Sequence, residues 1–250
     1  MARIKKIQHG QRVELTGHLD ELRTRVLVSV AAFGVALGLC FWQNHLVLSL
    51  ANIPLHGKQL ITLSPTEPFT TTLTLSAYAG LLLALPVVLY QVYAFVLPAF
   101  SRNERRVALP LMLMIPVLFV GGAAFAFFVV MPAALQFLLH FNADQFSTQI
   151  RAKEYYGFLS TTMIACGIVF QVPVGVLALT RLGVTDAAGL RAKRRYAWLG
   201  CAVVAAALPG VDPVTMLFEM VPLVALYELS IVLAALFGRE RAPDAAPQGS

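Results

Sequence analysis

Two acidic residues lie among arginines at the edges of apolar segments. Residues 18–25 read HLDELRTR and continue directly into apolar sequence, which places Glu21 beside a hydrophobic run of membrane length. Residues 101–106 read SRNERR and place Glu104 in a similar setting after a second apolar run. Each acid has an ordinary interpretation, because Glu21 can pair with Arg25 one helical turn later and Glu104 can belong to a basic loop. The alternative is that both acids are held for a cationic partner.

A second group of candidate residues consists of polar side chains inside the apolar segments. They are Gln91, Gln171, Glu219 and Glu228, with Asp212 in a turn that reads LPGVDP. A carboxylate within a membrane span is costly and usually faces the interior of a bundle or an ion path. An ion-coupled carrier is therefore one hypothesis, and a hydrogen-bonded packing role is the other. The chain shows no doubled half-sequence and no matched pair of broken helices, which argues against a carrier.

Nucleotide-dependent and metal-dependent chemistry has no motif in this sequence. GxxxxGK[ST], HExxH, CxxC and GxSxG are absent, and no His lies at ligand spacing from another His or Cys. Ser160 shows no His or Lys partner that would make it a hydrolase nucleophile. Cys40, Cys166 and Cys201 lie inside apolar runs, where cysteine is typically a packing residue. We therefore predict no catalytic residue, no bound metal and no cofactor.

A helical membrane bundle has to position the candidate residues. The chain of 250 residues is 58% hydrophobic and 13% charged, with a mean hydropathy of +0.73. Soluble domains carry about 25% charged residues, so this composition predicts an integral membrane protein. Six apolar segments are candidates for membrane-spanning helices. They cover residues 26–43, 73–97, 107–139, 155–180, 196–211 and 213–237.

The basic residues predict how these spans are oriented. The gaps on one side of the membrane hold 16 of the 19 Lys and Arg residues, and the gaps on the other side hold 3. Cytoplasmic loops are enriched in Lys and Arg, so both termini are predicted to be cytoplasmic. This distribution matters more than the net charge of +6, and no nucleic-acid partner is predicted. We expect one membrane domain, with a basic amphipathic segment over 1–25, a six-span bundle over 26–237 and a flexible tail over 238–250.

Two of the apolar segments have unusual lengths. Segment 107–139 holds 33 residues without a charge, so it should tilt, kink or continue along the outer surface. Segment 196–211 has only 16 residues, or about 24 Å of helix, whereas the hydrocarbon core is about 30 Å thick. The turn at 209–213 is therefore predicted to lie below the outer headgroups. Together these lengths predict an all-α bundle with a concave surface and short fifth and sixth spans.

Several motifs resemble one known family, the TatC subunits of the twin-arginine translocase. HLDELRTR resembles the family's HL-x-ELR-x-R signature, and LPVVLYQVYAFVLPAF at 85–100 followed by ERR is similar to its second-span and loop signature. Shorter agreements follow in the same order along the chain. They are PF at 68–69, FVVMP at 128–132, FQVPV at 170–174, LR-x-KR at 190–194 and the Pro/Asp turn before the last segment.

The resemblance implies a receptor and core subunit of this translocase in the cytoplasmic (inner) membrane. It implies binding of signal peptides with two adjacent arginines, and export of folded proteins with single-span TatA/TatB-type subunits, driven by the proton-motive force. It also implies contact with membrane lipid and a homo-oligomer within a complex. The glutamates of ELR and ERR form the family's signal-recognition site, which corresponds to Glu21 and Glu104. Arg23 matches a family position, and Leu22 and Phe95 are expected to contact the apolar part of the signal.

Three residues depart from the family pattern. Gln171 replaces a common Glu, Phe127 replaces a common Tyr, and Glu219 replaces an apolar residue. Gln171 and Glu219 have similar predicted depths, so we hypothesise that they face one cavity near Asp212. In this hypothesis the carboxylate that the family has at position 171 of the fourth span is replaced by Glu219 in the last span. It would contact a polar residue in a partner's span. The alternative is that Glu219 extends towards outer water. The rival function, an ion-coupled secondary carrier, would use Glu219, Glu228 and Asp212.

Overall fold

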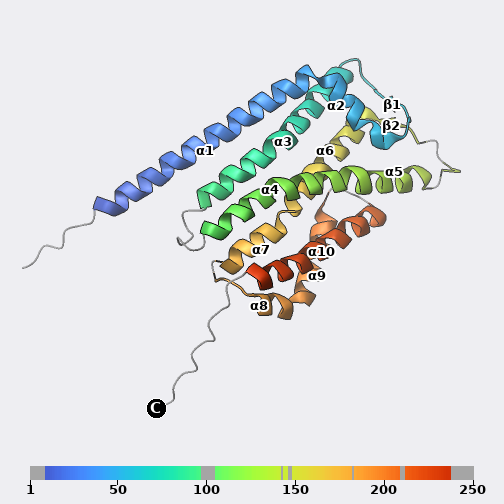
Figure 1. Cartoon of the computed structure of the whole chain (residues 1–250). Coiled ribbons are helices and arrows are strands. Elements are labelled where there is room, and N and C mark those ends of the chain that lie inside the picture. Colours follow the sequence, from blue (N-terminus) through green and yellow to red (C-terminus); the bar gives the residue numbers. More distant parts are fainter. Residues whose placement is uncertain are drawn as a thin grey trace, which may run out of the picture.

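A computed structural model describes most of the chain, and it is almost wholly helical (Figure 1). The described residues are 9–96, 105–141, 143–145, 148–181, 183–208 and 212–237, and the side chains of 9–19, 96 and 105–113 are not included. Glu104 and most of the turn at 209–213 lie outside the described residues, as do both terminal segments.

The first helix joins the predicted amphipathic segment and the first apolar segment. Helix α1 runs without a break over His9–Trp42, so Glu21 lies on a helix that continues into apolar sequence. A short helix α2 (Asn44–Ala51), a 3₁₀ turn η1 (Ile53–Leu55) and a strand β1 (Leu60–Ile61) follow. These three elements occupy what the sequence predicted only as a loop.

Helices α1 and α3 form a close antiparallel pair. Helix α3 covers Glu67–Val96 and packs along α1 (Figure 1). A Cβ atom added to Gly80 would lie 2.8 Å from the backbone of Leu37, so only glycine permits this approach. The helix begins six residues before the predicted segment 73–97, because the polar residues of its first turn are compatible with a helix although they are not apolar.

The third apolar segment forms one long helical run with an irregular centre. Helix α4 (Arg105–Phe125) continues through a π-helical segment, η3 (Ala126–Val130), into α5 (Met131–His140). The π-helical turn contains Phe127 and Phe128, and the helical run ends at His140. The expected irregularity of this segment is thus a change of helical hydrogen bonding.

The fourth apolar segment was predicted as one span, and Ala152–Arg181 is one candidate span, but its helix is interrupted. Two residues separate helix α6 (Ala152–Val169) from α7 (Val172–Arg181), and Gln171 is one of them. Pro173 explains the interruption, because proline has no backbone N–H to continue the helical ladder. Gly167 allows α6 to pack on α4, since a Cβ there would lie 2.5 Å from the ring of Phe119.

The last elements are two short helices and a long one. Helix α8 covers Ala187–Ala192, α9 covers Arg194–Ala207 and α10 covers Pro213–Phe237. The 14 residues of α9 span about 21 Å, which is shorter than a bilayer core of about 30 Å. The expectation of a short sixth span was wrong, because α10 has 25 residues. Asp212 and Pro213 start this helix directly after the turn, and Pro222 is accommodated inside it.

Five helical segments among the described residues are long and apolar enough to cross a membrane. They are Asp20–Trp42, Glu67–Phe95, Met114–His140, Ala152–Arg181 and Pro213–Leu236, and α9 is not among them. A sixth crossing and the cytoplasmic position of both termini therefore remain predictions. In Figure 1, one end of the molecule contains the beginnings of α1 and α4, the ends of α3 and α7, and helix α8. We call it the α8 end.

A small sheet closes the opposite end, which we call the β end (Figure 1). Strand β1 pairs in parallel with β2 (Ile150–Arg151), so that Leu60 is opposite Ile150. Below the sheet lies a buried cluster that includes Leu55, Met131 and Leu159. Two tyrosines of α6 fasten this cluster to the first loop: Tyr155 Oη donates to the Ala51 carbonyl at 2.6 Å and Tyr156 Oη to Asn52 Oδ1 at 2.8 Å.

Candidate functional site

The carboxylate of Glu21 holds a guanidinium group at the α8 end. Arg25, one turn later on α1, donates from Nε to Glu21 Oε1 at 3.0 Å, and its Nη2 donates to the same oxygen. Arg25 also reaches α3, donating from Nη1 to Gln91 Oε1 at 3.1 Å and from Nη2 to the Ala94 carbonyl at 3.2 Å. The Glu21 side chain is 36% exposed, so this carboxylate is accessible from outside the bundle.

The ordinary interpretation of Glu21 is therefore correct in part, because the helical pair with Arg25 exists. The pair belongs to a larger network that ties α1 to α3. Sequence reasoning missed this role of Arg25, since Gln91 lies 66 residues away. The signal that could have found it is a single amide close to the end of an apolar helix, opposite an arginine at the start of another.

The other predicted residues of this site are placed only in part. Leu22 and Arg23 follow Glu21 on α1 and are both exposed, while Phe95 is half-buried near the end of α3. The structure thus brings α1 and the end of α3 together around the Arg25 network. Whether Glu104 lies close to Glu21 stays a prediction, because Glu104 is outside the described residues.

Gln171 is held at the break between α6 and α7. Its Nε2 donates to the carbonyls of Ile115 and Gly167, each at 3.3 Å. Its Oε1 is buried and accepts no hydrogen bond from the described part of the chain. The amide therefore satisfies the Gly167 carbonyl at the break, joins α4 through the Ile115 carbonyl, and presents an oxygen with unused acceptor capacity.

Glu219 is a buried acid on α10. Its side chain is 2% exposed, so it does not extend to outer water as the alternative required. Neither carboxyl oxygen has a hydrogen-bond partner within the described ranges. It interacts electrostatically with Cys166 of α6 and with Asp212. Gln171 donates to the carbonyl of Gly167, which follows Cys166 in α6. Gln171 and Glu219 therefore both lie near the end of α6.

Asp212 and Glu228 both have local partners. Asp212 is buried and caps α10, accepting from Thr215 N at 2.7 Å and from the Thr215 hydroxyl. Glu228 accepts from Arg194 Nη2 at 2.6 Å, which joins α10 to α9. These contacts are sufficient structural reasons for both acids, so neither requires an ion path to explain it.

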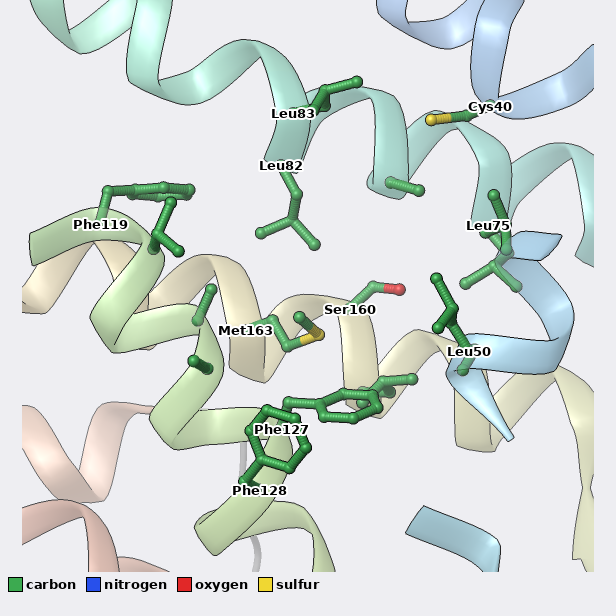
Figure 2. Close-up of a pocket in the computed structure, with 17 residues that line it drawn as sticks. Cys40, Leu50, Leu75, Leu82, Leu83, Phe119, Phe127, Phe128, Ser160 and Met163 are labelled. Carbon is green, nitrogen blue, oxygen red and sulfur yellow. The ribbon is translucent and has the colours of Figure 1, made fainter. Parts of the chain in front are cut away.

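An apolar cavity of about 490 Å³ lies between α2, α3, α4, η3 and α6, with Cys40 of α1 at its edge. Figure 2 shows Leu82, Phe127 and Met163 arranged around it, with the Ser160 hydroxyl on one wall. The residues that line it include no His or Lys, so Ser160 has no base beside it there. Gln171 and Glu219 do not line this cavity, so the hypothesis that they face one shared cavity stays a prediction. Across the described ranges, no cluster of His, Cys, Asp and Glu suits a metal ion.

The helices and their buried polar groups define a multi-pass α-helical membrane protein. More particularly, the chain belongs to the TatC family, because the family model described as Sec-independent protein translocase protein (TatC) matches residues 17–222. It is thus a subunit of the Tat protein translocase, and this membership is consistent with a multi-pass protein of the inner membrane.

Individual relatives are similar over almost the whole chain. The chloroplastic Sec-independent protein translocase protein of Arabidopsis thaliana is 37% identical, with 95% of this chain and 71% of that protein covered. TatC of Aquifex aeolicus is 36% identical over 91% of this chain and 97% of its own length. A crystal structure described as twin arginine translocase receptor TatC superposes with a TM-score of 0.76 at 35% identity, covering 87% of this chain and 99% of that one. These relatives are named as translocase components and none of the names denotes an enzyme.

Proposed function

We propose that this chain is the receptor and core subunit of its translocase and binds twin-arginine signal peptides at the α8 end. The observation that supports this most directly is that Glu21 already binds a guanidinium, that of Arg25, at an accessible position. The solved relative is itself called a twin-arginine translocase receptor. With single-span TatA/TatB-type subunits, a complex containing several copies would export folded proteins using the proton-motive force.

The proposed binding step is an exchange of guanidinium groups on Glu21. An arginine of the signal would replace Arg25, which keeps its contacts with Gln91 and the Ala94 carbonyl on α3. Fixed carboxylates suit arginine because each contact can use two parallel N–H donors. Glu104 is the proposed carboxylate for the second arginine. Exposed Leu22 and Arg23 would contact the rest of the signal, with Phe95 beside them on α3.

Peptide binding to Glu21→Gln tests this proposal. We expect the affinity for a twin-arginine peptide to fall by about 1.5–3 kcal/mol, the range for a hydrogen bond to a charged group, or roughly 10- to 150-fold. Asp20→Asn is the matched control, because Asp20 is exposed on the same helix and loses the same charge. Equal losses in the two variants would reduce the effect to general electrostatics and contradict a specific site.

Glu104→Gln is the corresponding test of the second carboxylate. We expect a loss of similar size, and a twin-lysine peptide should bind weakly to the unchanged protein because an ammonium cannot bind in a bidentate way. Reconstituted vesicles address the rival carrier function. A receptor moves no small solute in the absence of partner subunits, whereas solute uptake by this chain alone would establish the carrier.

The proposed topology has six crossings with both termini cytoplasmic. The shortness of α9 supports a recessed turn at 209–213, since 14 residues do not span a full bilayer core. Cysteines introduced at 209–213 should react poorly with a bulky, membrane-impermeant thiol reagent. Ready labelling along the whole turn would instead indicate an exposed loop.

A second proposed role concerns the membrane interior, where Glu219 and Gln171 would contact a polar residue in a partner's span. The support is that both have buried oxygens without a hydrogen-bond partner in the described part of the chain. We expect Glu219→Leu to impair export and Gln171→Glu to restore it in the double variant. Normal export by Glu219→Leu, or a defect that is unaffected by residue 171, would refute the relocation of the acid.

A further inference from the structure

A dense group of cations lies at the junction of α8 and α9. Arg191, Lys193, Arg194 and Arg195 are four cations within five residues, and all are exposed. The junction is fixed to α10, because Tyr227 Oη donates to the Leu190 carbonyl at 2.8 Å and Arg194 Nη2 donates to Glu228. The cations are therefore held on a rigid part of the bundle rather than on a free loop.

These cations have different degrees of neutralisation. Arg194 is paired with Glu228, the one acid that lines the adjoining pocket of about 460 Å³. Arg195 also lines this pocket, together with Trp198. Its guanidinium carbon lies 4.7 Å from the centre of the Tyr196 ring, and its Nη2 donates to the Tyr196 hydroxyl at 2.9 Å. Arg195 is thus oriented by a neutral group and keeps its full positive charge for a ligand.

An exposed apolar stripe begins directly at Arg195. Leu199 and Val203 follow at i+4 and i+8 on α9, so they lie on the same helical face as Arg195. They are 64% and 62% exposed, and Trp198 beside them is 47% exposed. The opposite side of α9 packs against α10, where Ala205 is buried. The cation therefore lies at the end of an apolar surface that faces away from the bundle.

We propose that this surface binds one anionic phospholipid. Its phosphate would accept hydrogen bonds from Arg195 and Lys193, and an acyl chain would lie along Trp198, Leu199 and Val203. Tryptophan and tyrosine favour the headgroup level of a bilayer, which is where a phosphate would meet Arg195. Basic pockets between membrane helices are suited to anionic headgroups. An acidic protein segment would use the cations but not the apolar stripe, so the combination favours a lipid.

Lipid retention by the full-length protein tests this proposal independently of signal-peptide binding. The purified chain is titrated with phosphatidylglycerol or phosphatidylcholine in detergent, and bound lipid is counted by native mass spectrometry. We expect preferential binding of phosphatidylglycerol, weakened roughly 10- to 30-fold in Lys193→Gln/Arg195→Gln, since each cation contributes about a fivefold effect. The control is Lys58→Gln/Lys153→Gln, which removes two exposed cations from the β end.

Two further measurements identify the ligand as a lipid. Leu199→Ser keeps every cation and should weaken lipid binding several-fold, while free glycerol phosphate should not displace bound lipid. Equal retention of the two lipids, or equal losses in the two double variants, would overturn the proposal. Displacement by free glycerol phosphate would identify a phosphate site only, and displacement by an acidic peptide would identify a protein-binding surface. Either of those outcomes would also overturn it.

Discussion

The two ends of the bundle each contain a carboxylate bound to an arginine, but the two carboxylates differ in burial. At the β end, Glu67 is 3% exposed and both of its oxygens are used. Arg151 donates to Oε1 at 2.9 Å and to Oε2 at 3.2 Å, and Leu63 N donates to Oε2 at 2.9 Å. At the α8 end, Glu21 is 36% exposed and Arg25 directs two donors to one oxygen.

The difference shows how one chemical pair can serve two purposes. The guanidinium of Arg151 is always charged, and its hydrogen bond with Glu67 beside the β1–β2 sheet raises its pKa further. Removing Arg151, which is itself 36% exposed, leaves the buried Glu67 carboxylate without compensation, whereas an exposed carboxylate that loses its partner is solvated by water. The pair at the β end therefore fixes the structure, whereas we propose that Glu21 at the α8 end exchanges its guanidinium for that of a signal.

The largest difference between the pairs is expected in thermal stability. Arg151→Gln removes the partner of a buried carboxylate, and we expect the melting temperature in detergent to fall by roughly 5 °C or more. Arg25→Gln, the matched change at the exposed pair, should lower it by only about 1–2 °C. Thermal unfolding of both variants, followed by tryptophan fluorescence or circular dichroism, measures the contrast.

Glu67→Gln/Arg151→Gln provides the control for this contrast. The double variant has no unpaired buried charge, because Glu154, the second partner of Arg151 at 3.6 Å, is 72% exposed. It should therefore recover part of the stability that Arg151→Gln loses. Equal losses in the two single Arg variants would show that burial does not distinguish the ends. The inference that the Glu67–Arg151 pair fixes the structure at the β end would then be wrong.

A smaller effect is expected on peptide binding, and it has the opposite sign. Arg25→Gln removes the guanidinium that a signal arginine has to displace, and it removes a like charge. Twin-arginine peptide should therefore bind about two- to fivefold more tightly, which matches the small free energy of an exposed ion pair. Fluorescence titration of labelled peptide measures the change. If Arg25→Gln weakens binding as much as Glu21→Gln does, Arg25 positions the carboxylate and does not compete for it.

The main fold was predictable because it depends on length and apolarity. The family, the membrane class and the short helix α9 followed from motifs and residue counts, and the comparisons and helices confirm them. The break at Gln171 was visible as a proline in FQVPV, but an apolar run alone suggested one continuous span. The short sixth span was a wrong inference from the recessed turn, because a capped helix can begin directly after that turn.

Contacts between distant segments were the part that sequence could not supply. Arg151 was counted only as a charge in a loop, yet it meets Glu67 across 84 residues through the pairing of two short strands. Two-residue strands have no periodic pattern that would reveal them. Arg25 and Gln91 were likewise both noticed, but only the packing of α1 on α3 brings them together.

The smallest effect is expected at the third carboxyl, that of Glu219, which is as buried as Glu67 but has no described hydrogen-bond partner. An isolated buried charge costs several kcal/mol, so we expect this acid to carry its proton in the isolated subunit. A protonated acid and an amide are similar in size and polarity, and Glu219→Gln should therefore change the melting temperature by no more than about 1 °C. Glu67→Gln, measured in parallel, exchanges a paired carboxylate for an amide and should have a clearly larger effect. If both substitutions shift the melting temperature equally, Glu219 is ionised and paired, and the difference in pairing between these two buried acids does not hold.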